Sequence, residues 1–144
     1  MTFEEVSASL PNGFHDAEIR RFEMDYVHRT LQFDLDVWIG DMDDSRRRER
    51  YRPARLTLAD VAFLVIEPPD VNDSWLKAGR IRIDVGEGRP PQSSSTLPVA
   101  PTGTRMTWIY LEELNTFLLF SAGNASLDWA GPEVDRPATL FQRK

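Results

Sequence analysis

The chain has 144 residues, of which 41% are apolar, 28% charged and 10% aromatic, a composition typical of one folded domain with a single hydrophobic core. The absence of cysteine excludes disulfides, cysteine zinc sites and thiol nucleophiles, and with only two histidines we expect neither a metal nor another cofactor. The net charge of −6 argues against binding to nucleic acid, which requires a basic surface.

Two neighbouring segments show the clearest pattern in the chain. Residues 31–39 carry an apolar side chain at every odd position, and residues 22–26 alternate in the same way at even positions. A period of two is typical of a β-strand with one buried and one exposed face. We therefore predict a hairpin with its turn over residues 27–30 and with Tyr26 opposite Leu31, because this register places all the apolar residues on one face.

The start of the first strand departs from this alternation. Ile19 lies out of step with the apolar positions that follow it, because Arg20 and Arg21 stand between it and Phe22. A β-bulge adds one residue to a strand and so changes the face on which the preceding side chain lies. We predict a bulge at Arg20-Arg21 that returns Ile19 to the core.

The later elements also read as strands. Residues 122–124, Ala-Gly-Asn, are typical of a hairpin turn, and no segment has the spacing of an amphipathic helix. We predict an all-β fold, a single-domain antiparallel β-sandwich or flattened barrel of about eight strands. Besides the first two, the predicted strands cover residues 54–58, 62–67, 81–85, 106–110, 116–121 and 125–129.

Two segments have the composition of loops. Residues 40–52 are charged throughout, and residues 86–103 are rich in Pro, Ser and Gly. We expect mobile loops at about 40–52 and 86–103. We also expect one domain that spans residues 1–144, because neither the segment before the second loop nor the segment after it is long enough to form a stable domain by itself.

The N-terminal residues and the apolar runs bear on location. Glu4 and Glu5 stand where a signal peptide carries basic residues, and the longest apolar run, residues 61–66, is far shorter than the ~20 residues that cross a bilayer. We expect a cytoplasmic protein without a membrane partner.

The predicted hairpin carries acidic residues on its outer face. In the register above, Glu23 lies opposite Asp34, and Asp25 lies diagonally from Asp34. Asp36 lies opposite Arg21. Like charges opposite each other destabilise a strand pair, so the pair Glu23–Asp34 is either solvated and balanced by a nearby arginine, or forms an acidic face for a basic partner.

Trp38 interrupts the polar side of the second strand. An exposed tryptophan suits an interface, but the pattern fits equally well with a ring that a loop or a second sheet covers. The candidate binding residues are thus Glu23, Asp25, Asp34, Asp36 and Trp38.

His15 and Asp16 form the second candidate site. Histidine titrates near neutral pH and acts in acid-base catalysis. However, adjacent residues of an extended chain point to opposite sides, and structural roles in a turn and at a sheet edge explain both residues as well. The chain lacks the motifs of the common hydrolase, phosphate-binding, dinucleotide-binding and zinc-protease sites.

The opening of the chain carries a family resemblance. Residues 13–19, Gly-Phe-His-Asp-Ala-Glu-Ile, precede two alternating strands, and Tyr51-Arg-Pro-Ala-Arg-Leu-Thr-Leu58 follows them. This arrangement resembles bacterial all-β proteins without an assigned activity and, distantly, immunity proteins of bacterial toxin systems. The resemblance implies a cytoplasmic binding protein without catalysis, and it assigns no active-site residue.

Three functions remain open from the sequence. The first is a non-catalytic protein-binding module, in its sharpest form an immunity-like protein that uses an acidic face against a basic partner. The second is a small enzyme with His15 and Asp16 in a cleft beside residues 86–103. The third is a homo-oligomeric structural module in which Trp38 and an edge strand form a symmetric interface.

Overall fold

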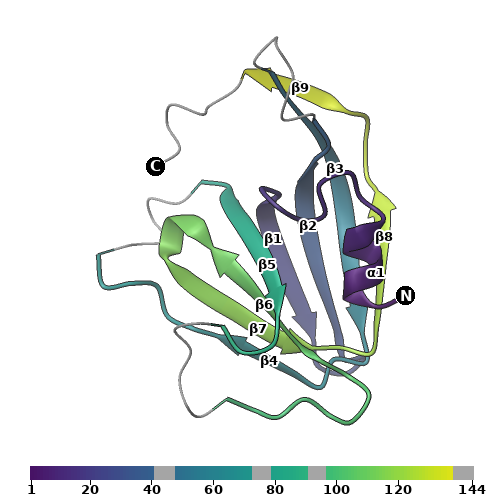
Figure 1. Ribbon diagram of the computed structural model, residues 1–144, viewed down its shortest axis with the longest axis vertical. Helices are drawn as coiled ribbons and strands as arrows, with labels where there is room; N and C mark the ends of the chain where they lie inside the picture. The colour runs from purple at the N-terminus through teal and green to yellow at the C-terminus, as the bar shows by residue number, and fades with distance from the viewer. Residues whose placement is uncertain (41–47, 73–78, 91–96, 138–144) are drawn as a thin grey trace.

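The computed structural model describes residues 1–40, 48–72, 79–90 and 97–137, which form nine β-strands, one α-helix and one turn of 3₁₀-helix (Figure 1). The elements are α1 (Phe3–Ala8), β1 (Glu18–Asp25), β2 (Thr30–Trp38), β3 (Arg48–Ala59), β4 (Phe63–Ile66), β5 (Ile81–Glu87), β6 (Met106–Leu111), η1 (Glu112–Leu114), β7 (Thr116–Ser121), β8 (Asn124–Trp129) and β9 (Val134–Pro137).

The strands form one antiparallel sheet in the order β4-β7-β6-β5-β1-β2-β3-β8, with β9 pairing with β3 beside β8. The sheet is not closed, and β6 and β7 run obliquely to β1, β2 and β3 (Figure 1). Only two residue pairs, Glu18–Arg82 and Ile19–Ile81, join β1 to β5. The all-β prediction is confirmed, and the open, folded sheet is sandwich-like.

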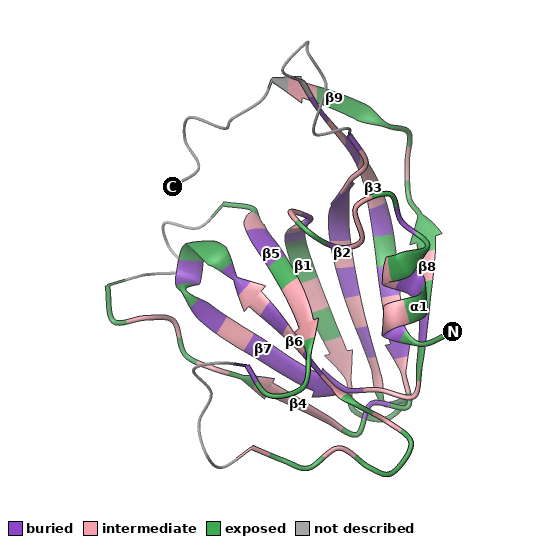
Figure 2. Ribbon diagram, in the orientation of Figure 1, coloured by how far each residue is buried: buried purple, intermediate pink, exposed green. Residues whose placement is uncertain are grey.

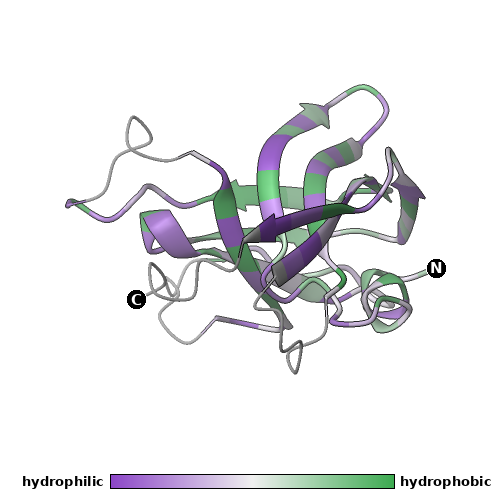
Figure 3. Ribbon diagram, turned by 90° about the horizontal axis from the view of Figure 1, so that it is seen from above, coloured by the Kyte–Doolittle hydropathy of each residue, from purple (hydrophilic) through white to green (hydrophobic). Residues whose placement is uncertain are grey.

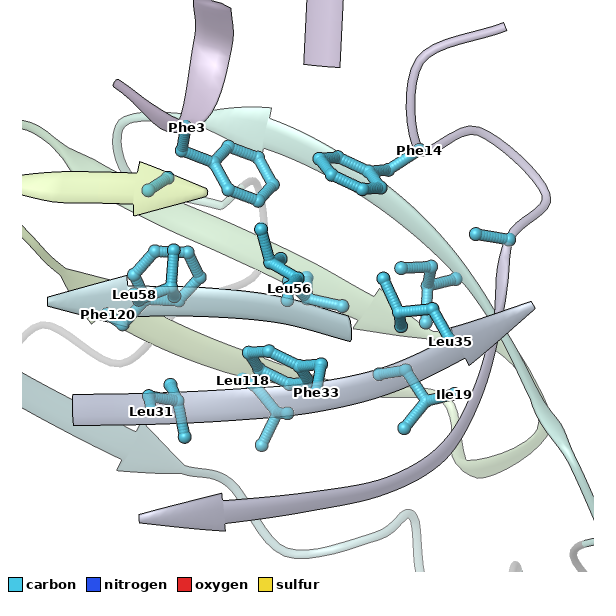
Figure 4. Packing of buried hydrophobic residues seen from close by; sticks show 14 of the residues in the cluster. Phe3, Phe14, Ile19, Leu31, Phe33, Leu35, Leu56, Leu58, Leu118 and Phe120 are labelled. Atoms are coloured by element: carbon cyan, nitrogen blue, oxygen red, sulfur yellow. The ribbon is translucent and has the colours of Figure 1, made fainter. Parts of the chain in front are cut away.

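The core lies between the two parts of the folded sheet. Alternate residues over the first part of β2 are buried, as the banding in Figure 2 shows, and the strands in Figure 3 are banded by alternating hydrophilic and hydrophobic residues. Phe33 of β2 and Leu118 of β7 are fully buried in one cluster, to which β3 adds Leu56 and Leu58 (Figure 4). Each such side chain contributes about 1.5–3 kcal/mol by its removal from water.

The helix α1 was not expected from the sequence. Thr2 caps it: the amide of Glu5 donates to Thr2 Oγ1 at 3.1 Å, and the amide of Thr2 donates to Glu5 Oε2 at 3.3 Å. The helix has six residues, too few for an apolar periodicity to emerge. It buries Phe3, whose ring stacks on Phe14 with 5.0 Å between centroids and meets Phe120 edge-on at 5.5 Å.

The register of the first hairpin differs from the prediction by two residues. Met24, and not Tyr26, lies opposite Leu31, and Asp25 lies opposite Thr30. Tyr26 is 85% exposed in the turn instead of being part of the core. A shift of two residues leaves every side chain on its original face, so the alternation alone does not distinguish the two registers.

The predicted β-bulge is confirmed. Ile19 pairs with Leu35 and Arg21 pairs with Asp34, so that Arg20 is the extra residue on β1. The bulge returns Ile19 to the core, where it is 6% exposed.

Both predicted loops are shorter than expected within the described residues. β3 begins at Arg48, inside the predicted loop 40–52, and β5 ends at Glu87, inside the predicted loop 86–103. The charged start of β3 is a strand because it pairs with charged residues of β9, with Glu49 opposite Arg136 and Arg50 opposite Asp135. Residues 41–47 and 91–96 of these loops lie outside the described residues.

In the described part of the chain, the α-helix α1 is far too short to cross a bilayer, and no other helix there has the length and apolar character of a membrane span.

Candidate functional site: the outer face and tip of the first hairpin

The outer face of the sheet carries a row of alternating charge across three strands. Asp34 of β2 lies opposite Arg21 on β1 and opposite Arg55 on β3. Its Oδ1 accepts a hydrogen bond from Arg55 Nε at 3.0 Å, and its Oδ2 lies 3.4 Å from Arg21 Nε. The hydrogen bond with Asp34 raises the pKa of Arg55. The Asp34 side chain is 18% exposed, whereas those of Arg21 and Arg55 are 61% and 51% exposed.

A second pair of carboxylate side chains, Asp36 and Glu18, lies closer to β9. Asp36 lies opposite Glu18, an arrangement that is unfavourable by itself. Arginines offset the repulsion: Asp36 lies 3.5 Å from Arg20 Nε and 3.6 Å from Arg80 Nη1, and Glu18 lies 2.8 Å from Arg136 Nη1. The side chains of Asp36 and Glu18 are only 11% and 12% exposed.

These contacts change the expected character of the face. Asp34 and Asp36 lie beneath guanidinium groups, and Glu23 lies opposite Gln32 while its carboxylate accepts from Arg21 Nη2 at 2.7 Å. The predicted like-charge pair Glu23–Asp34 is therefore not formed, and the prediction that Asp36 lies opposite Arg21 is also wrong. The outer face is charge-balanced, with Arg21 and Glu23 both 61% exposed, so of the two alternatives that the sequence left open the contacts favour carboxylates balanced by nearby arginines.

Asp25 has a local role that sequence reasoning missed. Its Oδ1 accepts from the amides of Val27 and His28 at 3.0 and 3.1 Å, and its Oδ2 lies 2.7 Å from His28 Nδ1. The side-chain hydrogen bond with His28 lowers the pKa of Asp25. Asp25 therefore holds the turn between β1 and β2 in one conformation.

The turn exposes two large apolar side chains. Tyr26 and Val27 are each 85% exposed at the tip of the hairpin. Arg29 has a left-handed backbone with φ 53°, and its carbonyl accepts a hydrogen bond from the amide of Val61 at 3.0 Å, which ties the turn to the segment between β3 and β4. We call Tyr26, Val27 and His28 the hairpin tip.

Trp38 lies at the far end of β2 from the hairpin tip and is half-buried. A β-carbon on Gly40 would lie 2.9 Å from its Nε1, so the indole lies across the glycine backbone. Asn12 Nδ2 donates to the carbonyl of Gly40 at 2.8 Å and is 3.3 Å from that of Trp38. The ring is thus neither a fully exposed contact residue nor a core residue.

His15 and Asp16 do contact each other, contrary to the prediction. His15 Nε2 lies 3.5 Å from Asp16 Oδ2, and its Nδ1 lies 3.3 Å from Asp84 Oδ1 on β5. Asp16 has a left-handed backbone with φ 58°, so the local chain is not extended and neighbouring side chains meet. The imidazole is 58% exposed, which means that no enclosed cleft surrounds it.

Arg82 links this cluster to η1. Its Nε lies 3.8 Å from Asp16 Oδ1, and its amide donates to Glu113 Oε2 at 2.8 Å. Burial raises the pKa of Glu113, against the lowering effect of this hydrogen bond. Arg82 and Glu113 thus join the turn before β1, the strand β5 and η1, which is a sufficient structural reason for a charged cluster here.

Among the described residues, no group of three or more His, Asp or Glu side chains is placed to hold a metal ion. The comparisons with known proteins add no further assignment: no family model, no curated protein and no solved structure matches this chain.

Proposed function

We propose that the chain is a non-catalytic, cytoplasmic protein-binding module that contacts its partner through the hairpin tip, with Arg21 and Glu23 at the rim. The observation that carries this proposal is the exposure of Tyr26 and Val27 on a turn that hydrogen bonds hold in one conformation. Exposed apolar residues are common singly, but two adjacent ones on a projecting, ordered turn provide contact area at a low entropic cost.

The charges on the hairpin determine the kind of partner that fits. Arg21 is shared between Glu23 and Asp34, so the rim offers both signs of charge and no net excess. A partner with an apolar pocket and a polar rim fits this surface better than a strongly basic one. We therefore expect the association rate to depend only weakly on ionic strength.

The immunity-like function stays a prediction that rests on the resemblance of the opening segment. An immunity-like function predicts that the partner is a toxin encoded next to this chain. It also predicts that the hairpin tip is required to neutralise that toxin. Candidate contacts Asp34 and Asp36 would act only indirectly, by fixing the arginines above them.

A capture experiment tests the proposal. The wild-type chain and the double variant Tyr26→Ser/Val27→Ser are used as baits in lysate from the native cell, and bound proteins are identified by mass spectrometry. Val99→Ser is the matched control, because Val99 is 89% exposed but lies outside the hairpin. A specific partner should be retained by the wild type and the control and lost by the double variant.

The purified partner then gives the affinity. By analogy with interface hot spots, we expect the double variant to bind about tenfold or more weakly in calorimetry, with no change in its unfolding midpoint. Light scattering on the free chain shows whether the partner is a second copy. Equal affinity of the wild type and the double variant would overturn the proposal.

A further inference from the structure

A cavity of about 390 Å³ opens at the narrow junction between β1 and β5. Its apolar lining comes from Ile19 and Phe22 of β1, Ile81 of β5, Leu111 of β6 and Leu118 of β7. Ile19, Leu111 and Leu118 are 6%, 4% and 0% exposed and belong to the core cluster of Figure 4, so the cavity leads from the surface to the core. A cavity of this size and lining accepts an apolar group.

The edge of β1 beside this cavity has no neighbouring strand over most of its length. Only Glu18 and Ile19 pair with β5, whereas β2 pairs with β1 as far as Asp25. In the described part of the chain, no strand pair or backbone hydrogen bond joins residues 20–25 to an element other than β2. Alternate residues of such an edge direct their N–H and C=O groups away from the sheet, and these groups can pair with an added strand.

Two exposed arginines stand beside the cavity. Arg20 lines it, and Arg80 lies between two residues that line it, Gly79 and Ile81. Arg20 Nε and Arg80 Nη1 lie 3.5 and 3.6 Å from the oxygens of Asp36, so the two arginines share one carboxylate. The arginine side chains are 41% and 51% exposed, and that of Asp36 is only 11% exposed. The charge that a partner meets here is positive, which favours acidic side chains in the partner.

The other charged residues near the cavity have closer partners of their own. Glu18 lies 3.9 Å from Arg80 but 2.8 Å from Arg136. Arg21, which also lines the cavity, donates from Nη2 to Glu23 Oε2 at 2.7 Å. The excess positive charge therefore stays with the two arginines above.

We propose that this groove binds an extended segment of a partner protein in which one apolar residue stands between two acidic ones. The segment pairs with the free edge of β1. Because side chains alternate along a strand, its apolar side chain enters the cavity while its carboxylates lie on the side of Arg20 and Arg80. The groove uses none of the three hairpin-tip residues, so this contact stands or falls independently of the one proposed above.

Four capped peptides test the groove. The first is acetyl-Thr-Glu-Leu-Glu-Thr-amide. The others replace both Glu by Lys, replace Leu by Ser, or carry methyl groups on the backbone nitrogens, which removes the N–H donors. Each is titrated into the full chain at neutral pH, and amide chemical shifts are recorded by NMR.

We expect saturable shifts around Phe22 and Ile81 with the first peptide. The Lys and Ser peptides should bind about threefold or more weakly, and the methylated peptide should not saturate. No saturation with the first peptide, or equal affinity for any of the other three, would overturn the proposal.

Variants locate the site. Arg20→Gln and Arg80→Gln should each weaken binding of the first peptide by about threefold. Arg55→Gln is the matched control, because Arg55 is a 51% exposed arginine of the same outer face that does not line the cavity. Wild-type affinity in both groove variants, or equal weakening in the control, would contradict the assignment.

Two further measurements separate this contact from the other possible ones. The double variant Tyr26→Ser/Val27→Ser should bind the first peptide as the wild type does, because the hairpin tip does not line the groove. Light scattering tests for a second copy as the occupant. A dimer of the free chain that the first peptide dissociates would assign the groove to a second copy and overturn the proposal.

Discussion

Asp25 is a short side chain that fixes the conformation of four residues. Because its carboxylate accepts hydrogen bonds from His28 and from two backbone amides, its pKa lies below the ordinary value of 3.8. The folded pKa is thus lower than the unfolded one. The stability that these bonds contribute is fully present above pH 3.8 and is lost as the pH falls through the folded pKa.

We predict that His28→Ala raises the pKa of Asp25 toward 3.8, because the side-chain hydrogen bond is the largest cause of the shift. An NMR titration that follows the carboxyl carbon of Asp25 measures the change. His15→Ala, which removes the other histidine, should leave this pKa unaltered. An unchanged Asp25 pKa in His28→Ala would show that the backbone amides alone cause the shift.

Glu113 shows the opposite behaviour. Burial raises its pKa, so ionised Glu113 costs stability, and that cost develops as the pH rises from the unfolded pKa through the folded one. Glu113→Gln keeps an oxygen that accepts from the Arg82 amide and removes the charge. We expect the variant to be more stable at pH 7, by no more than about 0.5 kcal/mol after solvent screening, and equal to the wild type at acidic pH.

Urea unfolding at pH 7 and at pH 3.5 measures this difference. Glu112→Gln is the control, because the Glu112 carboxylate lies 3.9 Å from Arg82 Nη1 and does not accept from the backbone amide. Lower stability of Glu113→Gln at pH 7 would contradict the prediction.

At the scale of elements, the hairpin shows which features a pattern of apolar residues determines. Alternation assigned the faces of β1 and β2, and the interruption at Arg20-Arg21 located the bulge, because both depend only on parity. The register depends instead on the turn, which Asp25 determines by accepting from the amides that follow it. An aspartate before a turn is a signal that sequence reasoning can use.

The strand pair β5–β6 depends on a glycine. Gly86 lies opposite Trp108, and a β-carbon at this position would overlap the indole ring, which itself meets Phe117 edge-on at 5.7 Å. We predict that Gly86→Ala lowers the free energy of unfolding by about 1–3 kcal/mol, because the ring must leave its position. Chemical denaturation measures the loss.

Gly79→Ala is the matched control, since a β-carbon on Gly79 meets no atom within 4 Å. This variant should change stability by no more than about 0.5 kcal/mol. A Gly86→Ala protein as stable as the control would mean that the indole moves aside without cost.

For the whole molecule, the narrow junction between β1 and β5 raises the question of whether the two parts of the sheet unfold separately. The core argues against this, because Phe33 of β2 and Leu118 of β7 belong to the same buried cluster. We predict one cooperative transition, with the amide signals of Phe33 and Leu118 lost at the same urea concentration in NMR spectra. Two separate midpoints would show that the junction divides the domain.

The candidate site was only partly predictable at this scale. The residues Glu23 and Asp25 do belong to the exposed hairpin, as the alternation indicated. Balance by a nearby arginine was one of the two alternatives left open for this face, but the sequence could not identify Arg55 and Arg80, which reach the hairpin only through the sheet order. Charge along the sequence therefore could not decide between an acidic and a balanced surface, because three strands and their connections assemble that surface.

The long strand β3 carries two short neighbours end to end, β9 along its first four residues and β8 along Ala54–Ala59. Because the strand pairing is interrupted between them, this edge of the sheet consists of two strands that pair with β3 independently. β9 can separate from β3 without opening the pairing of β8, because it pairs with β3 through its own four residue pairs, and Arg136 adds contacts with Glu18 and with the Tyr51 ring. In deuterium exchange, the amides of β9 should therefore label well before those of β8.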